Sequence, residues 1–156
     1  MPKEHHYNVG ITWTGNKGQG TTSATAYERS HTISAHGKPD IEGSSDVAFR
    51  GDISKYNPED FLVSALAQCH MLWYLHLCAD AGIVVTAYHD QAVGTMIESP
   101  TGGGHFTSVV LHPHVTLSDI SRAEQADTLH AKAHEKCFIA NSVNFPVTHK
   151  GVYVAG

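Results

Sequence analysis

The segment from Phe61 to Ala79 constrains the fold more than any other part of the chain. Fifteen of its 19 residues are apolar. Asn57 can cap a helix that begins at the next residue, and Glu59 and Asp60 suit the positive end of its dipole. Gly82 supplies the matching stop. The sequence therefore predicts one long helix that is apolar on nearly every face.

Such a helix either spans a membrane or lies buried in the centre of a fold. The buried position is favoured, because the ends carry Glu59, Asp60 and Asp80 rather than basic anchors. Polar side chains near the middle of the helix would also be costly in lipid. The N-terminus is polar from Met1 to His6 and has no apolar stretch behind it, so we expect no signal or transit peptide and a cytoplasmic location.

Composition and charge narrow the class of protein further. The chain has 156 residues, of which 41% are hydrophobic, enough for a core, and we expect one domain over residues 1–156. Ten Lys and Arg residues stand against 15 Asp and Glu residues, giving a net charge of −5. This balance argues against nucleic acid as a partner, because few cations are available to neutralise phosphates.

The remaining elements are predicted from turn formers and hydrophobic periodicity. We expect a β-hairpin over 5–33, a mostly irregular segment over 35–56, a second β-hairpin over 83–117, a helix from about 123 to 137, and a closing strand over 147–155. The order predicts an α+β fold in which antiparallel β-sheets pack around the long buried helix.

The cysteines are the first candidates for chemistry. Three cysteines are too few for a disulfide scaffold and form no Cys-x-x-Cys pair, so we expect reduced thiols. Cys69 stands about twelve residues into the long helix, beyond the reach of the helix dipole, so another group must stabilise its thiolate. An arginine is the best neighbour because it stays charged. Arg50, in the segment before the Asn57 cap, is the first choice and Arg29 the second.

Glu59 is a candidate to hold such an arginine in place. It precedes Cys69 by ten residues, about 15 Å along a helix, so the two side chains of one chain cannot meet around one guanidinium. If both belong to one site, they must come from two subunits whose helices pack antiparallel about a two-fold axis. The alternative is that Glu59 only stabilises the helix terminus.

The other two cysteines are predicted to have different roles. Cys78 is about 13 Å from Cys69 along the same helix, cannot form a disulfide with it, and is interpreted as a small buried residue. Cys137 ends the second predicted helix and could approach Cys69 from another direction to resolve an oxidised sulfur. A metal site is a further alternative, because His134 and Cys137 share a helical face that Cys69 could join, but it lacks a fourth ligand.

Two motifs then point to a known family. Asn57-Pro58-Glu59 is followed ten positions after the glutamate by Cys69, and Ala133-His134-Glu135-Lys136-Cys137 is followed by Asn141-Ser142. Together with the order of elements, these motifs resemble the OsmC/Ohr family (osmotically inducible protein C and organic hydroperoxide resistance protein). The resemblance implies an OsmC-like fold, an intertwined homodimer with two active sites at the subunit interface, and a thiol peroxidase that needs no cofactor.

The resemblance also implies roles for individual residues. Cys69 would be the nucleophile that peroxide oxidises to a sulfenic acid, and Cys137 would resolve it as a disulfide. Glu59 would hold an arginine against the thiolate, and Arg50 matches one branch of the family whereas Arg29 matches neither branch well. A dithiol reductant, lipoyl-linked in the family, would return electrons.

Two questions stay open at this stage. Trp73 and Tyr74 line either the substrate pocket or the core, and bulky apolar walls at the thiol would favour organic hydroperoxides over hydrogen peroxide. The competing class is a binding protein of the same fold that holds a small apolar ligand while its cysteines stay reduced.

Overall fold

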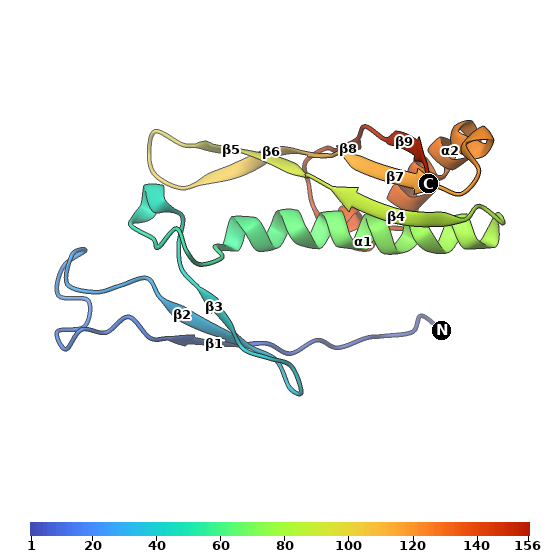
Figure 1. The fold of residues 1–156 in the computed structure, drawn as a ribbon. Helices are drawn as coiled ribbons and strands as arrows, with labels where there is room; N and C mark the ends of the chain where they lie inside the picture. Colours follow the sequence, from blue (N-terminus) through green and yellow to red (C-terminus); the bar gives the residue numbers. More distant parts are fainter. The chain divides into compact units, whose positions relative to one another are not determined.

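The computed structural model describes all 156 residues, which group into two compact units, Met1–Phe61 and Leu62–Gly156 (Figure 1). The elements run in the order β1, β2, β3, η1, α1, β4, β5, β6, β7, η2, α2, η3, β8 and β9. The nine strands form three sheets of three strands each. The mixture of small sheets with two helices confirms the predicted α+β class.

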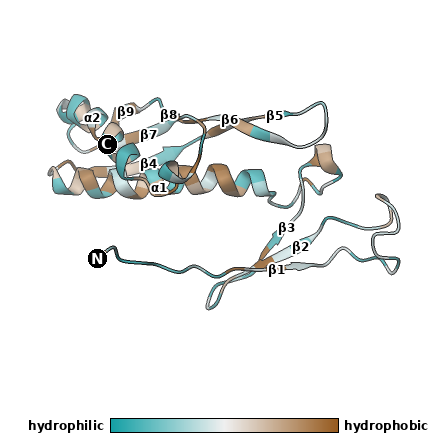
Figure 2. Ribbon diagram, turned by 180° about the vertical axis from the view of Figure 1, so that it is seen from behind, coloured by the Kyte–Doolittle hydropathy of each residue, from teal (hydrophilic) through white to brown (hydrophobic).

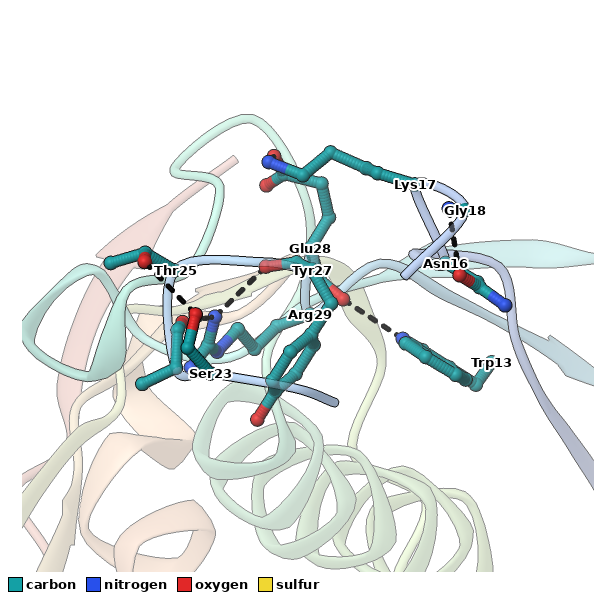
Figure 3. Close-up of polar contacts among 10 residues, drawn as sticks. Trp13, Asn16, Lys17, Gly18, Ser23, Thr25, Tyr27, Glu28 and Arg29 are labelled. Atoms are coloured by element: carbon teal, nitrogen blue, oxygen red, sulfur yellow. Dashed lines mark hydrogen bonds and ion pairs between the residues drawn. The ribbon is translucent and has the colours of Figure 1, made fainter. Parts of the chain in front are cut away.

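The first unit is built around the predicted N-terminal hairpin. Strands β1 (Gly10–Trp13), β2 (His31–Ser34) and β3 (Ile41–Gly43) form an antiparallel sheet in that order. The strands are shorter than predicted, because the connection between β1 and β2 forms a loop held by side-chain contacts. Figure 3 shows the indole of Trp13 donating to the Glu28 carbonyl at 2.9 Å. Turn formers thus extend the loop well beyond residue 20.

Helix α1 (Pro58–Asp80) follows the prediction closely. Asn57 and Asp60 cap it reciprocally: the Asp60 N–H donates to Asn57 Oδ1 at 2.8 Å, and the Asn57 N–H to Asp60 Oδ2 at 3.1 Å. At the other end Gly82 has a φ of 68°, and the Ile83 N–H donates to the Cys78 carbonyl. This hydrogen bond and the left-handed glycine form a Schellman motif.

Helix α1 buries one stripe rather than its whole surface. The buried residues recur at every fourth position: Leu66, His70, Tyr74 and Cys78. Leu72, on another face, is 61% exposed. Brown and teal segments alternate along the helix in Figure 2, which shows that polar residues interrupt the apolar run. By length and composition α1 also qualifies as a candidate membrane span.

Each of the two β runs predicted after α1 forms two strands. The strands are β4 (Val85–Asp90), β5 (Val93–Glu98), β6 (Gly104–Leu111) and β7 (Pro113–Leu117). Antiparallel pairs form between β5 and β6 and between β4 and β7. The breaks lie opposite each other, between the pairs Asp90–Pro113 and Val93–Val110, and the His112 N–H donates to Asp90 Oδ1 there at 2.7 Å. The predicted hairpin is therefore a kinked one that contributes to two sheets.

The closing segment also differs from the prediction in detail. It contains two strands, β8 (Val147–His149) and β9 (Val152–Ala155). Strand β8 pairs in parallel with β6, and β9 pairs in parallel with β7. The two C-terminal sheets are thus mixed rather than purely antiparallel. Helix α2 lies in the connection from β7 to β8, and β9 follows β8 after two residues, so both strands return in the direction that permits parallel pairing.

Helix α2 (Ala123–Lys136) lies between the short helices η2 (Ile120–Arg122) and η3 (Ala140–Ser142). Arg122 donates to the carbonyls of Ala81 and Gly82 and so ties the start of α2 to the end of α1. One core cluster joins α1, β7 and α2 through Tyr74, Cys78, Ile83, Val115, Leu117, Ala126, Leu129 and Ala133. A second cluster joins α1, β6 and β8 through Leu66, Val109, Leu111 and Val147.

Candidate active site

Cys69 lies near the middle of α1, beside the buried stripe. Consecutive helical residues differ by about 100° in direction, so Cys69 points away from the neighbouring His70, which is 1% exposed. The Cys69 side chain is partly exposed. Its position thus combines a rigid backbone with access from outside the core.

Cys137 lies where the chain leaves α2. Its N–H donates to the His134 carbonyl, and its extended backbone then directs the chain into η3. The side chain is 1% exposed. The Ala140 N–H donates to its Sγ at 3.4 Å. The second cysteine is therefore sealed within the fold and held by the backbone of the next helical turn.

Cys69 and Cys137, here called the thiol pair, lie within hydrogen-bonding distance of each other. The pKa of Cys137 is raised to about 11, mainly by burial and in smaller part by the neighbouring Cys69, while the N–H groups of Ala140 and Ile139 oppose the shift. Both cysteines are free. Helix α1 and the end of α2 thus bring together the two thiols predicted from the sequence.

Cys78 has the environment expected of a packing residue. It is 1% exposed and belongs to the core cluster of α1, β7 and α2. Burial raises the pKa of its thiol. The structure therefore supports no part for Cys78 in the chemistry of the thiol pair.

Arg50 and Arg29 lie in the first unit, in contrasting environments. The Arg29 guanidinium donates to the carbonyls of Ala24 and Tyr27 at 2.7 and 3.0 Å and lies 4.1 Å from the centre of the Tyr27 ring (Figure 3). Arg50 is exposed, and its backbone is left-handed, with a φ of 66°. A non-glycine residue in that region is strained, and strain of this kind clusters at functional loops.

The loop around Arg50 is well ordered by hydrogen bonds. Asp46 accepts from the Ala48 N–H at 2.7 Å through its side chain and from the Gly51 N–H through its carbonyl. The Ser45 hydroxyl donates to the Phe49 carbonyl at 3.0 Å. A loop fixed in this way holds its strained residue in place and leaves the Arg50 side chain free to contact another group.

Glu59, in the first turn of α1, has a carboxylate oxygen without a partner. Its Oε2 is buried and accepts no hydrogen bond. A buried carboxylate oxygen is costly unless a donor satisfies it, and a guanidinium is the donor that fits best. Arg50 and Glu59 belong to the first unit and the thiol pair to the second, so the placement of Arg50 and Glu59 at the thiols stays a prediction.

A cluster of histidines next to the thiol pair was not predicted from the sequence. His70 Nε2 and His130 Nδ1 lie 2.8 Å apart and form a hydrogen bond between α1 and α2. His130 stacks on Tyr74 at 3.8 Å, and the His149 ring lies 5.2 Å from His130. Burial lowers the pKa of His70 to about 4 and that of His130 to about 3. These histidines are therefore neutral at pH 7.

The cluster continues towards the surface through Asp127 and His149. The Tyr153 hydroxyl donates to Asp127 Oδ1 at 2.6 Å, which joins β9 to α2. Burial lowers the pKa of His149, and Asp127 opposes that shift. A shallow pocket of about 430 Å³ opens here, lined by Ala131, His134, Glu135, Val147, Thr148 and His149. No group of three or more His, Cys, Asp or Glu side chains is arranged to hold a metal ion.

The structure places Trp73 and Tyr74 in different surroundings. Tyr74 is fully buried in the core and stacks on His130. Trp73 is partly buried, with its ring 6.0 Å from that of Phe138 and the Lys136 ammonium 5.6 Å from its centre. Only Trp73 therefore lies beside the residues that flank the thiol pair.

Fold and site together define an α+β protein in which a reduced cysteine on α1 contacts a reduced cysteine at the end of α2. The family model for OsmC-like protein matches residues 51–150, and the chain belongs to that family. Among curated proteins none matches the chain.

Solved structures agree with the family assignment. An OsmC-like protein of unknown function from Vibrio cholerae is 32% identical, with a TM-score of 0.84 over 96% of this chain and 100% of that one. An organic hydroperoxide resistance protein OsmC from Legionella pneumophila is 19% identical, with a TM-score of 0.69 over 97% and 98% of the two chains. One from Elizabethkingia anophelis is 20% identical, with a TM-score of 0.68 over 99% and 100%. The last two show a shared fold.

Proposed function

We propose that this protein is a cysteine-based thiol peroxidase that reduces organic hydroperoxides and, more weakly, hydrogen peroxide. The observation that carries the proposal is the contact between a partly exposed thiol on α1 and a buried thiol at the end of α2. A nucleophile must meet its substrate, whereas a resolving thiol needs only to meet the nucleophile. The thiol pair has this asymmetry.

The reaction proceeds in two steps. The Cys69 thiolate attacks the terminal oxygen of ROOH and the O–O bond breaks, so that the hydroxyl stays on Cys69 as a sulfenic acid, while the alkoxide takes up a proton from solvent and leaves as ROH. The Cys137 sulfur then attacks the Cys69 sulfur, an S–S bond forms, and the hydroxyl leaves as water with the proton of Cys137. Peroxide is reduced by two electrons, and the two thiols are oxidised to a disulfide.

Arg50 and Glu59 complete the site in this proposal. The Arg50 guanidinium stabilises the Cys69 thiolate, and Glu59 of a second subunit holds that guanidinium. The unpartnered Glu59 oxygen supports this role, and so does the strained Arg50 backbone. Arg29 is less suitable, because the carbonyls of its own loop already occupy its donors.

A homodimer follows from the same proposal. Glu59 and Cys69 are about 15 Å apart along α1, so one subunit cannot place both at one guanidinium. The exposed apolar side chains, including Leu72 and Phe138 at 61% and 70%, supply surface for a partner copy.

Apolar side chains beside the thiol pair favour an organic substrate. Trp73 lies one helical turn after Cys69, and Phe138 directly follows Cys137 in the chain. Their rings are in contact. An alkyl or aryl hydroperoxide gains free energy by burying its apolar part on such a surface, whereas hydrogen peroxide has no apolar part to bury.

A dithiol reductant, lipoyl-linked in the family that the chain resembles, is proposed to return the electrons. The test is turnover of cumene hydroperoxide with dihydrolipoamide, compared with monothiol reductants. Cys69→Ser should lower turnover by at least about a thousandfold, because the nucleophile is lost. Cys78→Ser is the matched control and should retain turnover within about twofold. Equal turnover by the wild type and Cys69→Ser would overturn the proposal, and no turnover by the wild type would favour a ligand-binding protein.

A further inference from the structure

We propose that His70 and His130, here called the histidine clasp, position Cys137 against Cys69 for the disulfide-forming step. This inference rests on the proposed function, since it concerns the second step of the peroxidase cycle. The clasp and the thiol pair bridge the same two helices. His70 follows Cys69 directly on α1, and His130 precedes Cys137 by seven residues, or two turns, on the same face of α2.

The apolar contacts between the helices do not by themselves fix the position of α2. Ala126, Leu129 and Ala133 of α2 pack against the core around Tyr74 and Cys78. Such contacts are non-directional, so they define the rotation of α2 less exactly than a hydrogen bond does. A disulfide tolerates far less, because it needs Cβ atoms about 3.5–4.5 Å apart and a fixed dihedral angle.

Arg122 ties the start of α2 to the end of α1 by hydrogen bonds, and the clasp adds a directional contact between the two helices further along α2. A hydrogen bond of 2.8 Å between two ring nitrogens requires one distance and one ring orientation. The planes of His70 and His130 differ by 5°, and those of His130 and Tyr74 also by only 6°. Two aromatic rings of α1, those of His70 and Tyr74, thus lie against His130 of α2 and favour one rotamer of its side chain.

The tautomers follow from the buried nitrogens. His130 Nε2 is buried and has no hydrogen-bond partner. A bare acceptor is less costly to leave unpaired than an N–H donor. We therefore assign the proton of the clasp to His130 Nδ1, which donates to His70 Nε2. His130 is 0% exposed, so loss of this bond would leave a buried N–H unsatisfied and displace α2.

The experiment separates the two steps of the cycle by rapid mixing with cumene hydroperoxide. Sulfenic acid formation is followed with a dimedone-type trap, and disulfide formation is followed by quenched peptide mass. His70→Ala should leave the first step within about twofold and slow the second by about tenfold to a hundredfold, as misplacement by about 1 Å does. In the presence of excess peroxide, Cys69 sulfinic acid should then accumulate, because the sulfenic acid persists long enough to be oxidised again.

Conservative variants make the test specific. Glutamine places an amide at the position of a histidine Nε2, so His70→Gln should restore the disulfide rate to within about threefold of the wild type. His130→Phe keeps the ring on Tyr74 but removes the nitrogen, and it replaces His70→Ala if that variant does not fold. His76→Ala, on the same helix and exposed, is the matched control.

The outcomes distinguish the two proposals. If the wild type forms neither sulfenic acid nor disulfide, the peroxidase proposal fails and the clasp proposal fails with it. If the wild type completes both steps while His70→Ala and His130→Phe form the disulfide at the wild-type rate, only the clasp proposal fails. Equal slowing of both steps in these variants would also overturn it, because that result indicates a general loss of structure.

Discussion

The thiol pair and the histidine clasp are two contacts between the same helices, with opposite relations to water. Cys69 is partly exposed, and its neighbour His70 is sealed. The thiols form weak hydrogen bonds and exchange partners readily, whereas the histidines form a short bond inside a stack of rings. Two consecutive residues of α1, Cys69 and His70, thus make a reactive contact and a structural contact with the second helix. The difference shows how a fixed hydrogen bond, that of the histidine clasp, can position the two thiols that react.

Loss of the clasp should cost more folding stability than loss of the thiol pair. His130→Ala removes a fully buried ring that stacks on Tyr74, so we expect a loss of about 3–5 kcal/mol. Cys137→Ala removes only a small buried sulfur, and we expect about 1–2 kcal/mol. Urea unfolding followed by circular dichroism gives both free energies. A smaller loss for His130→Ala than for Cys137→Ala would break the comparison.

Acid should also act on the clasp first. The pKa values of His70 and His130, about 4 and 3 in the fold, lie below the ordinary value of about 6.5 in the unfolded chain. Between these values the unfolded state binds more protons, so stability falls as the pH falls from about 6.5 towards 4. His70 alone accounts for a loss on the order of 3 kcal/mol.

The groups facing the clasp modify this response. His149 and His134 oppose protonation of His70, and Asp127 favours protonation of His149. Tyr74 and Tyr153 stay neutral throughout the range, because burial raises the pKa of both hydroxyls. Urea unfolding at pH 7, 6, 5 and 4 measures the effect. In the His70→Gln/His130→Asn double variant the dependence should be much flatter, and an unchanged dependence would assign it to other groups.

The arginines should separate reactivity from stability. In the proposed site the Arg50 guanidinium stabilises the Cys69 thiolate. Arg50→Ala should therefore slow peroxide reduction by about a hundredfold, which corresponds to about 2.7 kcal/mol in activation free energy. The stability of Arg50→Ala should equal that of the wild type, because an alanine at this position carries the same left-handed backbone strain as the arginine. Arg29→Ala should do the reverse, since Arg29 holds its own loop. A larger loss of activity in Arg29→Ala would reverse the assignment.

The smallest expected effect concerns Cys78. It lies on the clasp side of α1, in contact with the core of α2. Cys78→Ala should lower stability by about 1–2 kcal/mol and leave both steps at the thiol pair unchanged. Thermal unfolding and cumene hydroperoxide turnover measure the two properties. Loss of a third thiol during oxidation would show that Cys78 takes part.

The long helix and the thiol pair could be predicted because their signals are local or specific. Asn57, Asp60 and Gly82 mark the helix ends by their own chemistry. Cys69 and Cys137 are rare residues in recognisable motifs. The break in the second hairpin could not be predicted, since it involves contacts between residues far apart in the chain, such as the hydrogen bond from the His112 N–H to Asp90.

The histidine clasp was missed for a similar reason. Thirteen histidines are scattered along the chain, and most such residues lie on the surface. The partners His70 and His130 are 60 positions apart. One signal was present: His70 falls on the stripe of every fourth residue that α1 buries, together with Leu66 and Tyr74. A histidine on a buried stripe needs a polar partner inside the core.

The central claim is that Cys69 and Cys137 form a disulfide when peroxide oxidises the protein. The most direct test is titration of the pre-reduced protein with cumene hydroperoxide and, separately, with hydrogen peroxide, with free thiols counted and the disulfide located by peptide mass. We predict loss of two thiols per chain, a Cys69–Cys137 link, and a faster reaction with the organic peroxide. Thiols that survive excess peroxide, or a disulfide that includes Cys78, would contradict the account.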